Sequence, residues 1–75
     1  MTNAKNFSWI LKVKNEDGTI YAYNESNPQR GYRQSWYKTP KSAMKKLQEA
    51  INYEKAHDNR EVIESYCFTS SGKTF

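Results

Sequence analysis

Cysteine and histidine are almost absent from this chain: Cys67 and His57 are single residues among 75. One cysteine excludes an internal disulfide and any zinc site built from several cysteines, and it is typical of a reducing compartment. No second residue completes a nucleophile-and-base arrangement around His57, whose position at a helix end suits a bond to the last carbonyls. We therefore expect a cytoplasmic, non-enzymatic protein without metal or cofactor.

Long apolar runs are missing too, since the longest strongly apolar run is Trp9-Ile10-Leu11 and no apolar segment opens the chain. This excludes a signal peptide and a membrane-spanning helix, so we expect no membrane partner. Internal repeats and low-complexity segments are also lacking. A chain of this length has room for one small core. We expect a single domain over residues 7–69, a frayed segment 1–6 and a polar tail 70–75.

One long helical period is present, over residues 39–57. Apolar residues recur there every three or four positions and form one stripe, with lysines on the opposite side. Thr39 is placed to cap the helix and Pro40 suits its first position. Glu54 falls at the centre of the apolar stripe. We therefore expect the buried part to end near Ile51 and the last turn to enter solvent.

Four segments have the pattern of strands, and they lie at 7–14, 19–23, 32–38 and 60–69. Apolar residues alternate in the first, and Asp17-Gly18 supplies a tight hairpin turn before the second. Residues 24–31 are rich in turn formers and predict a loop. The expected fold is α+β, in the order β-β-β-α-β, with a small antiparallel sheet of three or four strands and one amphipathic helix on one face.

One helix covers one face of such a sheet and leaves the other open. Candidates for the covered face are Trp9, Leu11, Ile20 or Tyr21, Trp36 and Tyr66, opposite Met44, Leu47 and Ile51. The pattern does not decide which side of 19–23 and 32–38 is buried. So thin a core also allows self-association through the open face or a sheet edge, as in a homodimer.

Aromatic residues make up 15% of the chain, which is more rings than one helix can cover, and the net charge is +4. Rings and cations interleave on the elements expected at the open face or its rim: Lys12, Lys14, Tyr21, Tyr23, Arg30, Tyr32, Arg33, Trp36, Tyr37 and Lys38. Phosphates bind cations and unpaired bases stack on rings, so this pattern favours a nucleic-acid surface. The competing interpretation is that the rings pack across strands and the lysines are merely solvated.

Residues 31–50, GYRQSWYKTPKSAMKKLQEA, resemble the arm-type DNA-binding domains at the N-termini of tyrosine integrases. Those domains have three antiparallel strands followed by one helix, and an aromatic-x-Thr strand end leads into the helix. The resemblance implies that the sheet enters the major groove of DNA. It implies base-reading roles for Lys12, Lys14, Tyr21, Tyr23, Arg33 and Gln34, and backbone contacts for Arg30 and Lys38. The segment 60–75 departs from that pattern by adding a strand.

Two functions follow as expectations. The first is a small nucleic-acid-binding module, with DNA as a more natural ligand than RNA. The alternative is a protein-binding inhibitor or adaptor of a phage or other mobile element, acting on a host protein, because Tyr, Trp and Arg also anchor protein interfaces.

Overall fold

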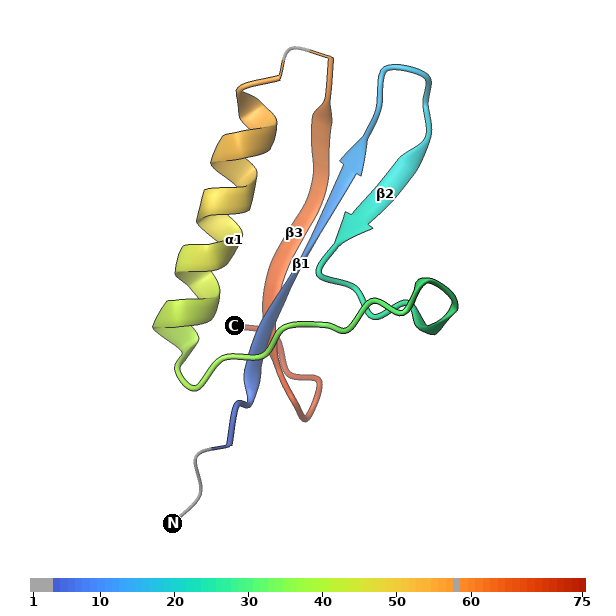
Figure 1. The fold of residues 1–75 in the computed structure, drawn as a ribbon. Helices are drawn as coiled ribbons and strands as arrows, with labels where there is room; N and C mark the ends of the chain where they lie inside the picture. Colours follow the sequence, from blue (N-terminus) through green and yellow to red (C-terminus); the bar gives the residue numbers. More distant parts are fainter. Residues whose placement is uncertain (1–3, 58) are drawn as a thin grey trace.

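The computed structural model describes residues 4–57 and 59–75, and it contains three strands and one α-helix (Figure 1). These elements are β1 (Phe7–Lys14), β2 (Ile20–Tyr23), α1 (Pro40–Lys55) and β3 (Glu61–Thr69). The strands form one antiparallel sheet in the order β2-β1-β3. Figure 1 shows α1 on one face of this sheet, alongside β1 and β3. The predicted α+β class with a small antiparallel sheet and one helix is confirmed.

The β1–β2 hairpin forms where the Asp-Gly pair predicts it. Gly18 has a φ of 91°, which glycine adopts without a steric penalty, and the Asn15 and Thr19 backbones close the turn with an N···O distance of 2.7 Å. The Asp17 carboxylate accepts hydrogen bonds from the Thr19 hydroxyl at 2.6 Å and the Thr19 amide at 3.0 Å. These bonds lower the pKa of Asp17.

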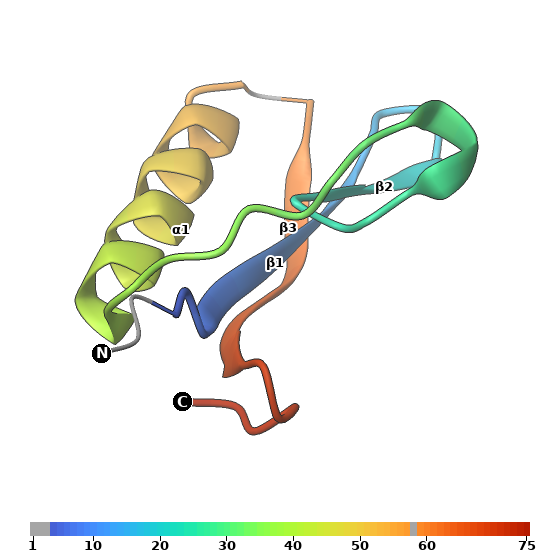
Figure 2. The same cartoon turned by 60° about the horizontal axis from the view of Figure 1, so that its bottom comes forward.

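The predicted strand over residues 32–38 is wrong. That part of the chain is an irregular segment, so the element order is β-β-α-β rather than β-β-β-α-β. The reason is that β2 already pairs with β1 from Leu11 to Lys14. The returning chain reaches β1 only beyond the end of β2, where Phe7 and Tyr37 exchange two backbone hydrogen bonds of 3.0 and 2.7 Å. Figure 2 shows this segment crossing from the loop to the start of α1.

The core lies between β1 and α1. Leu11 and Val13 on β1 and Ala43 on α1 are fully buried, and Trp9 and Cys67 complete the cluster. Each large apolar side chain buried in this way contributes about 2 kcal/mol. Burial raises the pKa of the Cys67 thiol, which suits a residue that only packs.

The predicted covered face is partly confirmed. Trp9 and Leu11 are in the core, and of the two alternatives on β2 it is Tyr21 that packs against it, whereas Ile20 lies exposed on the opposite side. Trp36 and Tyr66 also lie away from the helix, beside Phe68, with ring centroids 5.5 and 5.8 Å from it. Met44 is exposed although it was expected against the sheet, whereas Leu47 and Ile51 are half-buried there.

The helix begins as predicted, because the Thr39 hydroxyl accepts a hydrogen bond from the Ser42 amide at 3.2 Å and Pro40 occupies the first turn.

At the C-terminal end of the chain, residues 73–75 fold back on the outer edge of β3. The Thr69 amide donates to the Lys73 carbonyl at 2.8 Å, and the Phe75 amide donates to the Cys67 carbonyl at 3.1 Å. The ring of Phe75 then meets Phe7 edge-on, with centroids 5.7 Å apart.

The expected fraying of 1–6 falls partly outside the described residues, which begin at 4. Among the residues that the structure describes, no helix is long and apolar enough to cross a membrane.

Candidate functional site

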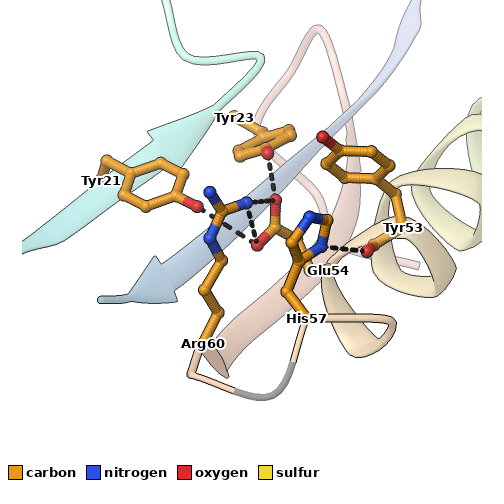
Figure 3. Close-up of polar contacts among 6 residues, drawn as sticks. All are labelled: Tyr21, Tyr23, Tyr53, Glu54, His57 and Arg60. Atoms are coloured by element: carbon orange, nitrogen blue, oxygen red, sulfur yellow. Dashed lines mark hydrogen bonds and ion pairs between the residues drawn. The ribbon is translucent and has the colours of Figure 1, made fainter. Parts of the chain in front are cut away.

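Two tyrosines of β2 reach across the sheet to the helix. Tyr21 and Tyr23 pair with Val13 and Leu11, so they share the face of the sheet on which α1 lies. The Tyr21 hydroxyl donates to Glu54 Oε1 at 3.2 Å, and the Tyr23 hydroxyl donates to Oε2 (Figure 3). The two rings lie 5.5 Å apart at an angle of 32°. Tyr21 therefore lies on the covered face, as one of the two alternatives predicted, and neither tyrosine lies on the open face that the nucleic-acid interpretation gave them.

Glu54 is the charged centre of this cluster. Its side chain is 1% exposed, although the last turn of the helix was expected to enter solvent. Arg60, which precedes β3, places Nη1 3.4 Å from both carboxylate oxygens. Two hydroxyl donors and one cation satisfy the carboxylate, and this explains why the apolar stripe tolerates it. Burial and the bond to Glu54 raise the pKa of Tyr23.

His57 closes the helix beside this cluster. Its Nδ1 donates to the Tyr53 carbonyl oxygen at 2.9 Å, and the Tyr53 and His57 rings lie 4.8 Å apart (Figure 3). This is the helix-end bond that the sequence predicts for His57. The cluster of Tyr21, Tyr23, Glu54 and Arg60 was missed, although Glu54 on an apolar stripe and the alternating tyrosines were its signals.

The two β2 tyrosines are only half-buried, because β2 is the edge strand on the side away from α1 (Figure 1). Tyr32 stands opposite them on the loop and is 44% exposed. Together with Arg30 they line a hollow of about 500 Å³ between β2 and the loop. We call this the tyrosine hollow and define it by Tyr21, Tyr23, Arg30 and Tyr32.

Asn24 attaches the loop to the sheet. It is buried at a φ of 60°, and its Nδ2 donates to the Trp9 carbonyl at 2.9 Å and to the Ser8 hydroxyl at 3.1 Å. Its Oδ1 accepts from the Ser35 amide at 2.8 Å and from the Tyr32 hydroxyl at 3.2 Å. The Asn24 side chain thus joins the start of the loop to β1 and also holds the chain at Tyr32 and Ser35, beyond the loop tip.

The loop tip carries exposed cations. Asn27 and Tyr32 exchange two backbone hydrogen bonds of 3.0 Å, and a 3-10 turn (Pro28–Arg30) with Gly31 at a φ of 70° lies between them. Arg30 and Arg33 are exposed, and Gln34 is half-buried beside the Ser35 attachment.

Lys12 and Lys14 occupy the sheet face away from α1, as expected, but acidic residues of β3 stand opposite them. Lys12 pairs with Glu64 at 3.3 Å, and Lys14 is in register with Glu61. The hydrogen bond and charge of Glu64 raise the pKa of Lys12. The lysines on this face are therefore balanced by acidic residues of β3.

The eight predicted site residues thus fall into three groups. Lys12 and Lys14 lie on the sheet face away from α1, Tyr21 and Tyr23 lie on the face toward α1, and the rest lie on the loop and the irregular segment that follows it: Arg30, Arg33, Gln34 and Lys38. The structure brings Tyr21, Tyr23 and Arg30 together at the tyrosine hollow.

Positive charge is concentrated in one stretch of chain. Between Gly18 and Gln48 there are six lysines and arginines and one acidic residue, Glu25, whereas the rest of the chain has six basic and seven acidic residues. Figures 1 and 2 show this stretch running from the loop tip, which projects beyond β2, past the start of β1 to the start of α1. We call this the basic end and define it by Arg30, Arg33, Lys38, Lys41 and Lys45. The first turn of α1 contains no acidic residue, so the positive end of the helix dipole adds to it.

No family model, curated protein or solved structure matches this chain. The integrase resemblance stays a prediction, and the element order differs from it, because two strands rather than three precede the helix. Within the described residues, no group of three or more His, Cys, Asp or Glu side chains is placed to hold a metal ion.

Proposed function

We propose that this chain is a small, non-enzymatic nucleic-acid-binding module of the cytoplasm, with DNA as its expected ligand. The observation that carries the proposal is the separation of charge along the chain, since the whole positive excess lies within residues 18–48, which include the basic end. A phosphate backbone is the common cellular polyanion whose binding gains most from such an arrangement, through release of its counterions.

The side chains that would make contact differ from those suggested by the sequence. The basic end replaces Lys12 and Lys14 as the main phosphate-binding surface, because those two lysines face acidic residues of β3. The sole histidine and the sole cysteine both have structural roles, at the helix end and in the core. This supports a binding role rather than catalysis.

A protein-binding adaptor or inhibitor of a phage or other mobile element is the second candidate, and one observation favours it. A shallow hollow of about 250 Å³ runs between α1 and the outer edge of β3, and Met44, Leu47, Ile51 and Phe75 line it. Met44 is 55% and Phe75 is 47% exposed, and exposed apolar side chains beside a strand edge suit a host protein or a second copy of the chain.

Charge reversal tests the first candidate. We expect Arg33→Glu with Lys38→Glu to weaken binding to a fluorescent oligonucleotide about tenfold or more. The matched control is Lys14→Glu with Lys55→Glu, which changes the net charge equally at the opposite end of the molecule (Figure 1). We expect the control to change affinity less than about threefold, because exposed charges separated by more than a Debye length are largely screened. Equal losses in both variants would show that the basic end is not the binding surface.

A further inference from the structure

We infer that the tyrosine hollow accepts an unpaired nucleobase, so that the ligand of this module is single-stranded nucleic acid rather than intact duplex. This inference rests on the proposed function and names its substrate class. Three tyrosines and one arginine from two separate elements, β2 and the loop, line the hollow together with one carboxylate, Glu25.

The rings are held in place before any ligand arrives. The Tyr21 and Tyr23 hydroxyls are both bonded to Glu54, and the Tyr32 hydroxyl is bonded to Asn24 at 3.2 Å. Their rotation is therefore already restricted in the unbound protein. A base that stacks on them loses little affinity to the ordering of side chains. Stacking on fixed rings is tolerant of sequence because every base has two aromatic faces.

Cations lie on both sides of the rings. Arg30 lines the hollow from the loop, and Arg60 lies beyond the hydroxyl end of Tyr21 (Figure 3). Only Nη1 of Arg60 bonds to Glu54, and the side chain is one third exposed, so the rest of the guanidinium can meet an anion. This arrangement provides a cation for the phosphate on each side of a stacked base.

A duplex does not satisfy this geometry. Paired bases present their edges in the grooves, and their faces are hidden in the stack. An aromatic side chain, in contrast, stacks on the face of a base. The hollow of about 500 Å³ is also within the range typical of small-ligand pockets, so it suits one base rather than a double helix. A base must leave the stack, or come from a single strand, to reach it.

The test compares an oligothymidine of about 20 nucleotides with a duplex of the same length, by fluorescence anisotropy at about 50 mM salt. We expect the single strand to bind about tenfold more tightly. Tyr32→Leu removes the aromatic face but keeps an apolar side chain, and we expect it to weaken single-strand binding about fivefold or more, with duplex binding unchanged. Tyr32→Phe retains the ring and should stay within about twofold of the natural chain.

Tyr53→Leu is the matched control, because Tyr53 is also exposed and lies outside the hollow. Circular dichroism checks that each variant is folded. Equal affinity for both probes, or no effect of Tyr32→Leu, would overturn the inference while leaving the proposed function standing. Salt-insensitive binding, or binding of neither probe, would overturn the proposed function as well.

Discussion

Glu54 is the residue that links the three parts of this molecule: the helix, the edge strand β2 and the start of β3. A buried carboxylate is costly unless donors surround it, and here two tyrosine hydroxyls and one guanidinium do so. The same bonds orient the rings of the tyrosine hollow. Stability and the shape of the candidate binding site therefore depend on one side chain.

Removal of the Glu54 carboxylate should leave its donors unpaired. We expect Glu54→Ala to lower the free energy of unfolding by about 2 to 3 kcal/mol. Glu54→Gln keeps an acceptor of the same size and should cost about 1 kcal/mol. Glu49→Gln is the control, since Glu49 is exposed and pairs only with Lys46 at 3.6 Å, and it should cost less than about 0.5 kcal/mol. Urea titration measures all three, and equal effects of the two glutamine variants would contradict the role given to Glu54.

Tyr23 should make the stability depend on alkaline pH. Its pKa is raised above the ordinary value of 10.0, so the folded state holds the phenol proton more tightly than the unfolded state. This contribution is fully present below pH 10 and is lost as the pH rises through the raised pKa. We expect Tyr23→Phe to be less stable than the natural chain at pH 8, by about 1 kcal/mol, because one hydrogen bond is lost.

The same comparison by urea titration at about pH 11 should give a smaller difference, because by then the natural chain has lost part of the contribution of Tyr23, whereas the variant had none to lose. A difference that stays constant with pH would show that Tyr23 is not held neutral by its surroundings.

At the scale of elements, local patterns predict most of the fold. Alternation in 7–14, the Asp-Gly turn and the Thr39-Pro40 helix start all appear where the sequence places them. Residues 32–38 alternate as well, but alternation cannot reveal that β2 occupies the edge of β1 they would need. Their hydrogen bonds go instead to Asn24 and Phe7, and Tyr32 bonds to Asn27 within the loop.

Two substitutions separate the contribution of the Asn24 side-chain hydrogen bonds to stability from the effect of its left-handed backbone. We expect Asn24→Gly, which tolerates a φ of 60°, to lower the free energy of unfolding by about 2 kcal/mol through the loss of its hydrogen bonds. Asn24→Ala loses the same bonds and adds the strain of a left-handed backbone, so it should be less stable by about 1 kcal/mol more. Thermal or urea unfolding measures both variants. If alanine were as stable as glycine here, the backbone strain would play no part.

For the molecule as a whole, the sequence identifies the residue types of the candidate site but not their grouping. Interleaved cations and rings predict one surface, yet the structure divides them between two faces and a loop. Lys12 is neutralised by Glu64, a partner 52 positions away along the chain that no local pattern reveals. Tyr21 and Tyr23 face the helix because their register with Val13 and Leu11 places them on that side of the sheet, where they bond to Glu54. The separation of charge, in contrast, needs no knowledge of the fold, since it depends only on where the charged residues fall in the sequence.

The dependence of oligonucleotide affinity on salt tests this separation of charge most directly. Three to five contacts from the basic end predict that the logarithm of the association constant falls linearly with the logarithm of the salt concentration, with a slope of about −2 to −4 for a single strand. Arg33→Glu with Lys38→Glu should bring that slope closer to zero. An affinity that does not change between about 50 and 200 mM salt would contradict the account.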